Sequence, residues 1–124
     1  MEDFMPNKAL LTAAAAFIFS SPVMANDCKQ PSVPDVPNGA EASLEIMISG
    51  QKAVKAFQAD AQGYRGCLEA VLEDIKSTAE EGDKEAAAAF KAATDAYNAS
   101  VAAEEKLASD FNSAIQAYKG ANPN

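Results

Sequence analysis

Apolar side chains recur every seven residues along most of this chain, and that spacing restricts the possible folds more than any other feature of the sequence. Two series follow it between residues 40 and 81, offset by three residues: Met47, Val54, Ala61, Leu68 and Ile75, and then Phe57, Tyr64 and Val71. Paired series of this kind place an apolar stripe along one side of an α-helix, as in a coiled coil. No proline interrupts these residues, so the pattern predicts one long helix over residues 40–81.

A second helix is expected over residues 84–119, after a turn at Gly82 and Asp83. Its heptad series consists of Phe90, Tyr97, Glu104, Phe111 and Tyr118, interleaved with Thr94, Val101, Ala108 and Ile115. Gly120 and Pro123 are expected to end it, which leaves residues 121–124 as a disordered tail.

Two helices of matched length joined by so short a turn lie antiparallel. A turn at residues 82–83 sets Ile75 opposite Phe90 and Val54 opposite Phe111. The predicted fold is therefore all-α, an antiparallel two-helix hairpin that resembles a coiled coil.

Composition limits what such a hairpin can do. The chain has 124 residues, enough for one small domain, and it contains no His, which excludes Ser-His or Cys-His catalysis and histidine-bound metals. A net charge of −8 argues against binding to nucleic acid or to an anionic membrane surface. We expect no cofactor and no nucleic-acid partner.

Residues 1–25 have the pattern of a secretory signal peptide. A short apolar stretch, residues 9–19, is followed by the small residues that precede a cleavage site, which we place after Ala25. The acidic first residues do not suit such a peptide, so Met5 is an alternative start, and an uncleaved anchor helix is an alternative interpretation. We expect a periplasmic or secreted protein without stable membrane insertion after cleavage.

Export changes the interpretation of the two cysteines. In an oxidising compartment, Cys28 and Cys67 are most simply explained as one disulfide, because metal binding by these two alone would lack ligands.

Residues 26–39 are expected to form an extended strap. Pro31, Pro34 and Pro37 recur at the three-residue period of polyproline II, which also suits a ligand for another protein's aromatic groove. We favour a strap that runs back along the first helix and is tied to it by the disulfide. It would lie in a groove of small residues: Ser49, Ala53, Ala56, Gly63, Cys67 and Ala70.

Three further details accompany the strap. Gly63 and Gly66 would allow its backbone to approach closely, and Val33 and Val36 would face the groove together. Residues 38–41 are expected to cap the first helix as a capping box, with Ser43 as the second candidate.

Few residues of the sequence are candidates for a catalytic or ligand-binding role. Glu104 occupies a seam position within reach of Tyr64, and a partly buried carboxylate can be functional. The alternative is that Glu104 lies at the edge of the helix contact, where its carboxylate reaches water or forms a hydrogen bond with the Tyr64 hydroxyl. The acidic turn, residues 80–85, lacks the ligand pattern of a calcium loop, and no catalytic set is apparent.

One resemblance covers most of the chain after residue 25. Its motifs are Cys28, Pro31, Pro34, Pro37-Asn38-Gly39, Met47, Phe57, Tyr64, Cys67-Leu68, Phe111-Asn112 and Tyr118-Lys119. In these the sequence resembles a group of small, uncharacterised exported proteins of Gram-negative bacteria. The resemblance implies a periplasmic helical hairpin and brings no activity or functional residue.

The function expected from these features is non-catalytic. The chain would act through protein contacts, as an adaptor, accessory subunit or chaperone-like envelope-stress factor. Leu44, Ile48 and Leu72 lie off the seam and form a candidate interaction face for an unknown protein partner or a second copy. A carrier of small hydrophobic ligands, using a slot between helices and strap, is the alternative. An enzyme is the third and least favoured possibility.

Overall fold

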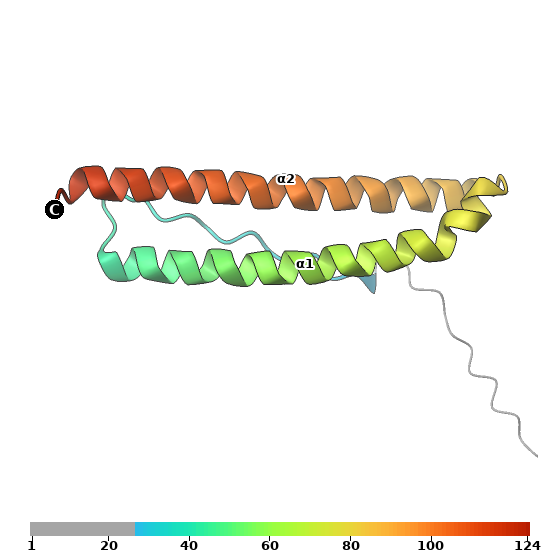
Figure 1. Ribbon diagram of the computed structural model, residues 1–124, viewed down its shortest axis with the longest axis horizontal. Coiled ribbons are helices and arrows are strands. Elements are labelled where there is room, and N and C mark those ends of the chain that lie inside the picture. Colours follow the sequence, from blue (N-terminus) through green and yellow to red (C-terminus); the bar gives the residue numbers. More distant parts are fainter. Residues whose placement is uncertain (1–26) are drawn as a thin grey trace, which may run out of the picture.

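The computed structural model describes residues 27–124, so the predicted signal peptide and its cleavage site lie outside the described residues. Two long helices, α1 (Leu44–Glu80) and α2 (Lys84–Ala121), lie side by side and antiparallel (Figure 1). Their 37 and 38 residues correspond to a length of about 56 Å each at 1.5 Å per residue. The predicted all-α hairpin is confirmed.

Helix α1 begins later than the capping-box interpretation predicts. The Ser43 hydroxyl accepts a hydrogen bond from the backbone N–H of Ile46 at 3.2 Å and caps the helix. Asn38 instead forms a separate turn, in which its side-chain oxygen accepts from the N–H of Ala40 and its carbonyl accepts from Glu41 and Ala42. The capping box at residues 38–41 is therefore wrong, because an Asn that bonds the backbone two residues ahead closes a turn.

The hairpin turn has the expected chemistry. Gly82 adopts a φ of +93°, a left-handed conformation that favours glycine. The Asp83 carboxylate accepts from the N–H of Ala86 at 2.8 Å and caps α2. At the other end α2 continues through Gly120 to Ala121, since Gly120 does not enter the left-handed region that would end the helix. The expected end at residue 119 is thus two residues short.

The register of the two helices also agrees with the expectation. The Arg65 side chain on α1 contacts Ser100 on α2, and Tyr97 on α2 donates to the carboxylate of Glu69 on α1. On α1 the predicted seam is buried or half-buried throughout, with the most enclosed side chains at Ala61, Leu68 and Val71.

The centre of the α2 face differs from the predicted series. The buried residues spaced by seven are Ala93, Ser100, Leu107 and Ala114, whereas the predicted aromatic series is half-buried except for Phe111. Small side chains at the centre allow the helices to approach closely, and the larger ones then cover the edges of the contact. The core is accordingly a narrow strip along the hairpin.

The strap follows the hairpin between the two helices and ends at the disulfide of Cys28 with Cys67 on α1 (Figure 1). All three of its prolines are half-buried. Val36 packs against the core near the start of α1, while Val33 is 52% exposed, so the expectation that both valines face the groove is half wrong. The strap contacts both helices rather than α1 alone.

Two glycines bring the strap close, and they are not the predicted ones. A Cβ at Gly39 would lie 1.8 Å from the carbonyl oxygen of Ala114 on α2, and one at Gly50 would lie 3.1 Å from the ring of Pro37. Gly63 and Gly66 have nothing within 4 Å of an added Cβ. The predicted role of Gly63 and Gly66 in close backbone approach is therefore wrong, because the strap does not pass directly over them.

Candidate functional site

The residues that flank the seam of α1 form two rows with different surroundings. Ile46, Ala53, Asp60 and Cys67 are spaced by seven and face the strap, and we name this the strap side. Leu44, Gln51, Gln58, Arg65 and Leu72 are spaced by seven in the other flanking position, and we name this the open side. The two sides present different chemistry.

The disulfide anchors the strap side. Cys28 and Cys67 are bonded at an S–S distance of 1.99 Å, with their Cα atoms 5.6 Å apart. Cys28 is buried in a core cluster with Leu68, Val71 and Ala93. The cystine thus joins the strap to both helices, covalently to α1 and by packing to α2.

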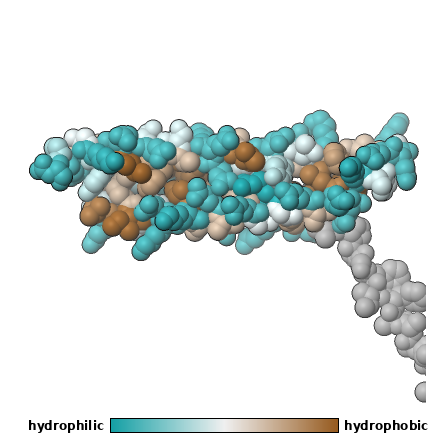
Figure 2. Space-filling model, viewed as in Figure 1, coloured by the Kyte–Doolittle hydropathy of each residue, from teal (hydrophilic) through white to brown (hydrophobic). Residues whose placement is uncertain are grey.

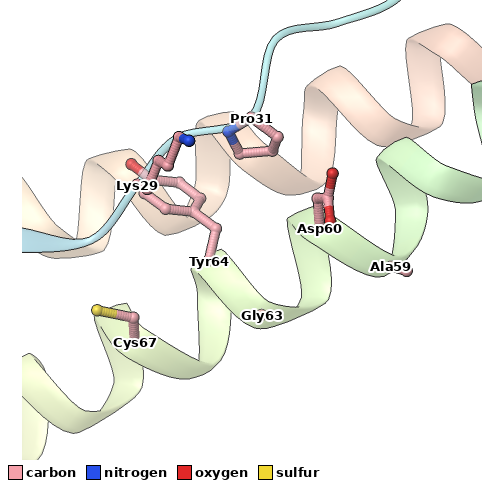
Figure 3. Close-up of a pocket in the computed structure, with 7 residues that line it drawn as sticks. All are labelled: Lys29, Pro31, Ala59, Asp60, Gly63, Tyr64 and Cys67. Carbon is pink, nitrogen blue, oxygen red and sulfur yellow. The ribbon is translucent and has the colours of Figure 1, made fainter.

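A pocket of mixed polar and apolar lining lies next to this disulfide (Figure 3). It has a volume of about 390 Å³ and is enclosed by the strap and one face of α1. Lys29 and Pro31 of the strap lie near the ring of Tyr64, and Asp60 is one helical turn away (Figure 3). An ammonium, a carboxylate and a phenol therefore line one opening, together with the apolar groups of Pro31 and Ala59.

The structure does not pair Glu104 with Tyr64. The Glu104 carboxylate forms a salt bridge at 2.7 Å with Arg65, and the same guanidinium donates to the Ser100 hydroxyl at 3.2 Å. The Arg65 and Glu104 side chains are 14% and 22% exposed, and Ser100 is buried. This cluster satisfies the polar groups in the middle of the open side, so its geometry is that of a structural ion pair.

Arg65 is the member that the sequence analysis missed. It stands between Tyr64 and Gly66 on the helix and has no apolar periodicity to mark it. The predicted register contains the one usable signal, because it sets residue 65 opposite residue 100 and within one turn of Glu104.

A second, apolar groove lies on the open side near the start of α1. It has a volume of about 230 Å³ and lies between α1 and α2, with no strap residue in its wall. Its lining residues are Leu44, Met47, Ile48, Gln51, Phe111, Ile115, Tyr118 and Lys119. Leu44 is 58% exposed and Ile48 43% exposed, although both are large aliphatic side chains. We name this the apolar groove.

The predicted interaction face is therefore divided. Leu44 and Ile48 share the apolar groove, while Leu72 is half-buried against the second core cluster. Between Leu44 and Leu72 the helix advances about 42 Å. Figure 2 shows apolar atoms gathered where α1 begins and smaller groups farther along the hairpin, separated by hydrophilic surface.

Other chemistry is sparse in the described part of the chain. Residues 27–124 contain no group of three or more Cys, Asp or Glu side chains placed to hold a metal ion, the acidic turn included. No helix among these residues is both long and apolar enough to cross a membrane.

Comparison with known proteins adds no relative. No family model matches the chain, and no curated protein and no solved structure is found to be similar to it. The function must be argued from the two sides of the hairpin.

Proposed function

We propose that this chain is a non-catalytic exported protein that acts through protein contacts, as an adaptor, an accessory subunit or a chaperone-like factor of the periplasm. The observation that carries the proposal is the apolar groove, in which Leu44 and Ile48 stay exposed on adjacent turns of α1. Soluble proteins seldom leave contiguous large aliphatic side chains in water unless another molecule covers them.

The shape of the groove supports a protein partner. Aliphatic side chains of α1 face Phe111, Ile115 and Tyr118 of α2 across it. A tyrosine at the rim combines apolar area with a hydroxyl, which is typical of protein interfaces. A partner that presents apolar side chains at helical spacing would fit this surface.

Export to the periplasm is supported by two features. The disulfide suits an oxidising compartment, because cytosolic reductants keep thiols reduced. Residues 1–25 have the sequence pattern of a cleaved signal peptide.

Photo-crosslinking in the cells that make the protein tests the proposal. A photoreactive amino acid replaces Ile48 in the apolar groove, and in a matched control it replaces Ile46, which is 52% exposed on the strap side. We expect adducts of defined mass from position 48 and not from position 46, and wild-type protein produced in the same cells should compete for them. Absence of adducts at position 48, or equal labelling at both positions, contradicts the proposal.

The pocket beside the disulfide favours a second candidate, a small-ligand carrier. Its lining of Lys29, Asp60 and Tyr64 offers both charges and a hydroxyl around about 390 Å³. A carrier should gain thermal stability in the presence of its ligand, by about 2.7 kcal/mol at a hundred times the dissociation constant. A thermal-shift screen of small polar and apolar compounds, repeated with Tyr64→Ala, would detect it, and a screen without any shift would exclude this candidate.

A further inference from the structure

The strap packs along the helix contact on one side of the hairpin only, although Val33 and Ile46 on that side are each still 52% exposed. On the strap side, residues 27–39 fill the space beside the helix contact, where their own Cys28 is buried and Val36 and Pro37 are half-buried against the helices. On the open side, nothing in the described chain performs this role, and Leu44 and Ile48 remain exposed. The asymmetry indicates a missing covering element along the open side.

We propose that a second copy of this chain supplies that element, in an antiparallel homodimer whose two open sides face each other and form a four-helix bundle. The inference rests on the proposed function, because it names the partner of the same surface.

The distribution of apolar residues along the open side favours a long partner. Leu44, Ile48, Ile115 and Tyr118 lie near the start of α1. A second pocket on the open side lies near the turn, where Ala79, Ala87 and Phe90 line it together with Lys76 and Glu80. Leu72, in the same row as Leu44 and Ala79, lies between the two. A short peptide would cover one region, whereas a second hairpin of about 56 Å covers both.

The area is sufficient for a stable dimer. Two adjacent helices about 56 Å long, with axes 8–10 Å apart, present a strip on the order of 800–1,000 Å² on one side. A typical stable interface buries about 800 Å² per partner. The polar cluster of Arg65, Glu104 and Ser100 would sit at the middle of this strip, already paired within its own chain.

Charge selects the antiparallel orientation. The half of the hairpin near the turn, residues 66–103, has eight acidic and three basic side chains, and the rest of the described chain has eight and six. In a parallel two-fold dimer each turn would meet its own copy, so the two acidic halves and the Glu69 side chains would oppose each other. The antiparallel dimer instead places each half near the turn, with a net charge of −5 (three basic minus eight acidic), beside the less acidic half of the second copy, with a net charge of −2 (six minus eight), which lowers the repulsion.

Oligomeric state tests the interface. Analytical ultracentrifugation of the mature, oxidised protein should give a dimer, and Ile48→Glu should raise its dissociation constant at least 100-fold. Ile46→Glu is the matched control, because it places the same charge at another exposed isoleucine, 52% exposed against 43% for Ile48, on the strap side and should leave the dimer intact. A wild-type monomer at several hundred micromolar, or equal weakening by both variants, overturns the proposal. Circular dichroism confirms that both variants remain folded.

Orientation has its own measurement. A spin label on Ser77→Cys is exposed near the turn, and the native cysteines are paired and do not react. With the two-fold axis at the middle of α1, near residue 62, two labels in the antiparallel dimer lie about 45 Å apart along the helices. In a parallel dimer they lie within about 20 Å of each other, the width of two helices. A short distance therefore contradicts the antiparallel arrangement.

Failure of the dimer is distinguishable from failure of the proposed function. A monomeric protein whose position 48 crosslinks to a different protein overturns the dimer and supports a protein-contact function. A monomeric protein with no adduct at position 48 contradicts both.

Discussion

One substitution, glycine to alanine, should have opposite effects at two positions in this chain. At Gly39 an added Cβ lies 1.8 Å from the Ala114 carbonyl oxygen and 3.0 Å from the Tyr118 nitrogen, both backbone atoms of α2 that cannot rotate away. At Gly63, in the middle of α1, an added Cβ meets nothing within 4 Å. The pair therefore separates a steric role of glycine from its intrinsic helix propensity.

The magnitude follows from these contacts. A Cβ contact shorter than 3.0 Å does not persist, so the turn at residue 39 must move away from α2 by at least about 1.2 Å. The movement loosens the packing of Val36 and Ala42 on the core, and overpacking of this kind costs about 1–3 kcal/mol. Gly63→Ala should instead stabilise the protein by about 0.5–1 kcal/mol, because alanine favours a helix interior.

Thermal unfolding followed by circular dichroism measures both effects. For a domain of about 100 residues each kcal/mol shifts the melting temperature by about 4–8 °C. We expect a lower melting temperature for Gly39→Ala and a higher one for Gly63→Ala, with the same helix content at 20 °C. If Gly39→Ala has the same melting temperature as the wild type, the strap does not contact α2 as described. A destabilised Gly63→Ala would mean that the strap does pass over that glycine.

Three further substitutions test the disulfide, the polar cluster and the turn. Cys28→Ala with Cys67→Ala removes a loop closure of about 40 residues, worth at most about 4 kcal/mol, and should lower the melting temperature by more than 10 °C; an unchanged value refutes the covalent role. Arg65→Ala leaves Glu104 without its partner and should lower the free energy of unfolding, measured in urea, by about 1–2 kcal/mol. The same substitution in a Glu104→Gln background should lower it by less. Additive losses would mean that the two side chains do not interact. Gly82→Ala must adopt a φ near +93° and should cost about 1–2 kcal/mol in the same assay, whereas a neutral result would show a different turn.

Helix α1 and the register could be predicted because large apolar residues and a turn glycine define them locally. Met47, Val54 and Leu68 repeat at the heptad spacing, and Gly82 sets where the chain reverses. Once the turn is placed, the pairing of residues along both helices follows from geometry alone.

The face of α2 could not be predicted in the same way. Its buried centre includes Ala93, Ser100 and Ala114, and the same helix carries many other alanine and serine residues that are exposed. Only the approach of α1 decides which of the many small residues is enclosed. Periodicity of the large side chains therefore identified the edges of the contact and not its centre.

Contacts between distant segments explain the remaining differences. Gly39 is required because the turn after the strap touches the backbone of α2, a constraint that no local pattern reveals. Arg65 pairs with Glu104 only through the helix register. Both depend on tertiary packing, whereas the disulfide could be predicted from the expectation of export and the presence of two cysteines.

The position of Cys67, partway along α1, has a consequence for the unfolded protein. The disulfide closes a covalent ring from residue 28 to residue 67, which contains the strap and the first part of α1 but no residue of α2. After unfolding, the ring keeps its residues close together, while residues 68–124, which include the end of α1, the turn and α2, become a free tail. The oxidised denatured state thus consists of a compact cyclic segment and a linear segment. Refolding requires the linear segment to pack against the cyclic segment again.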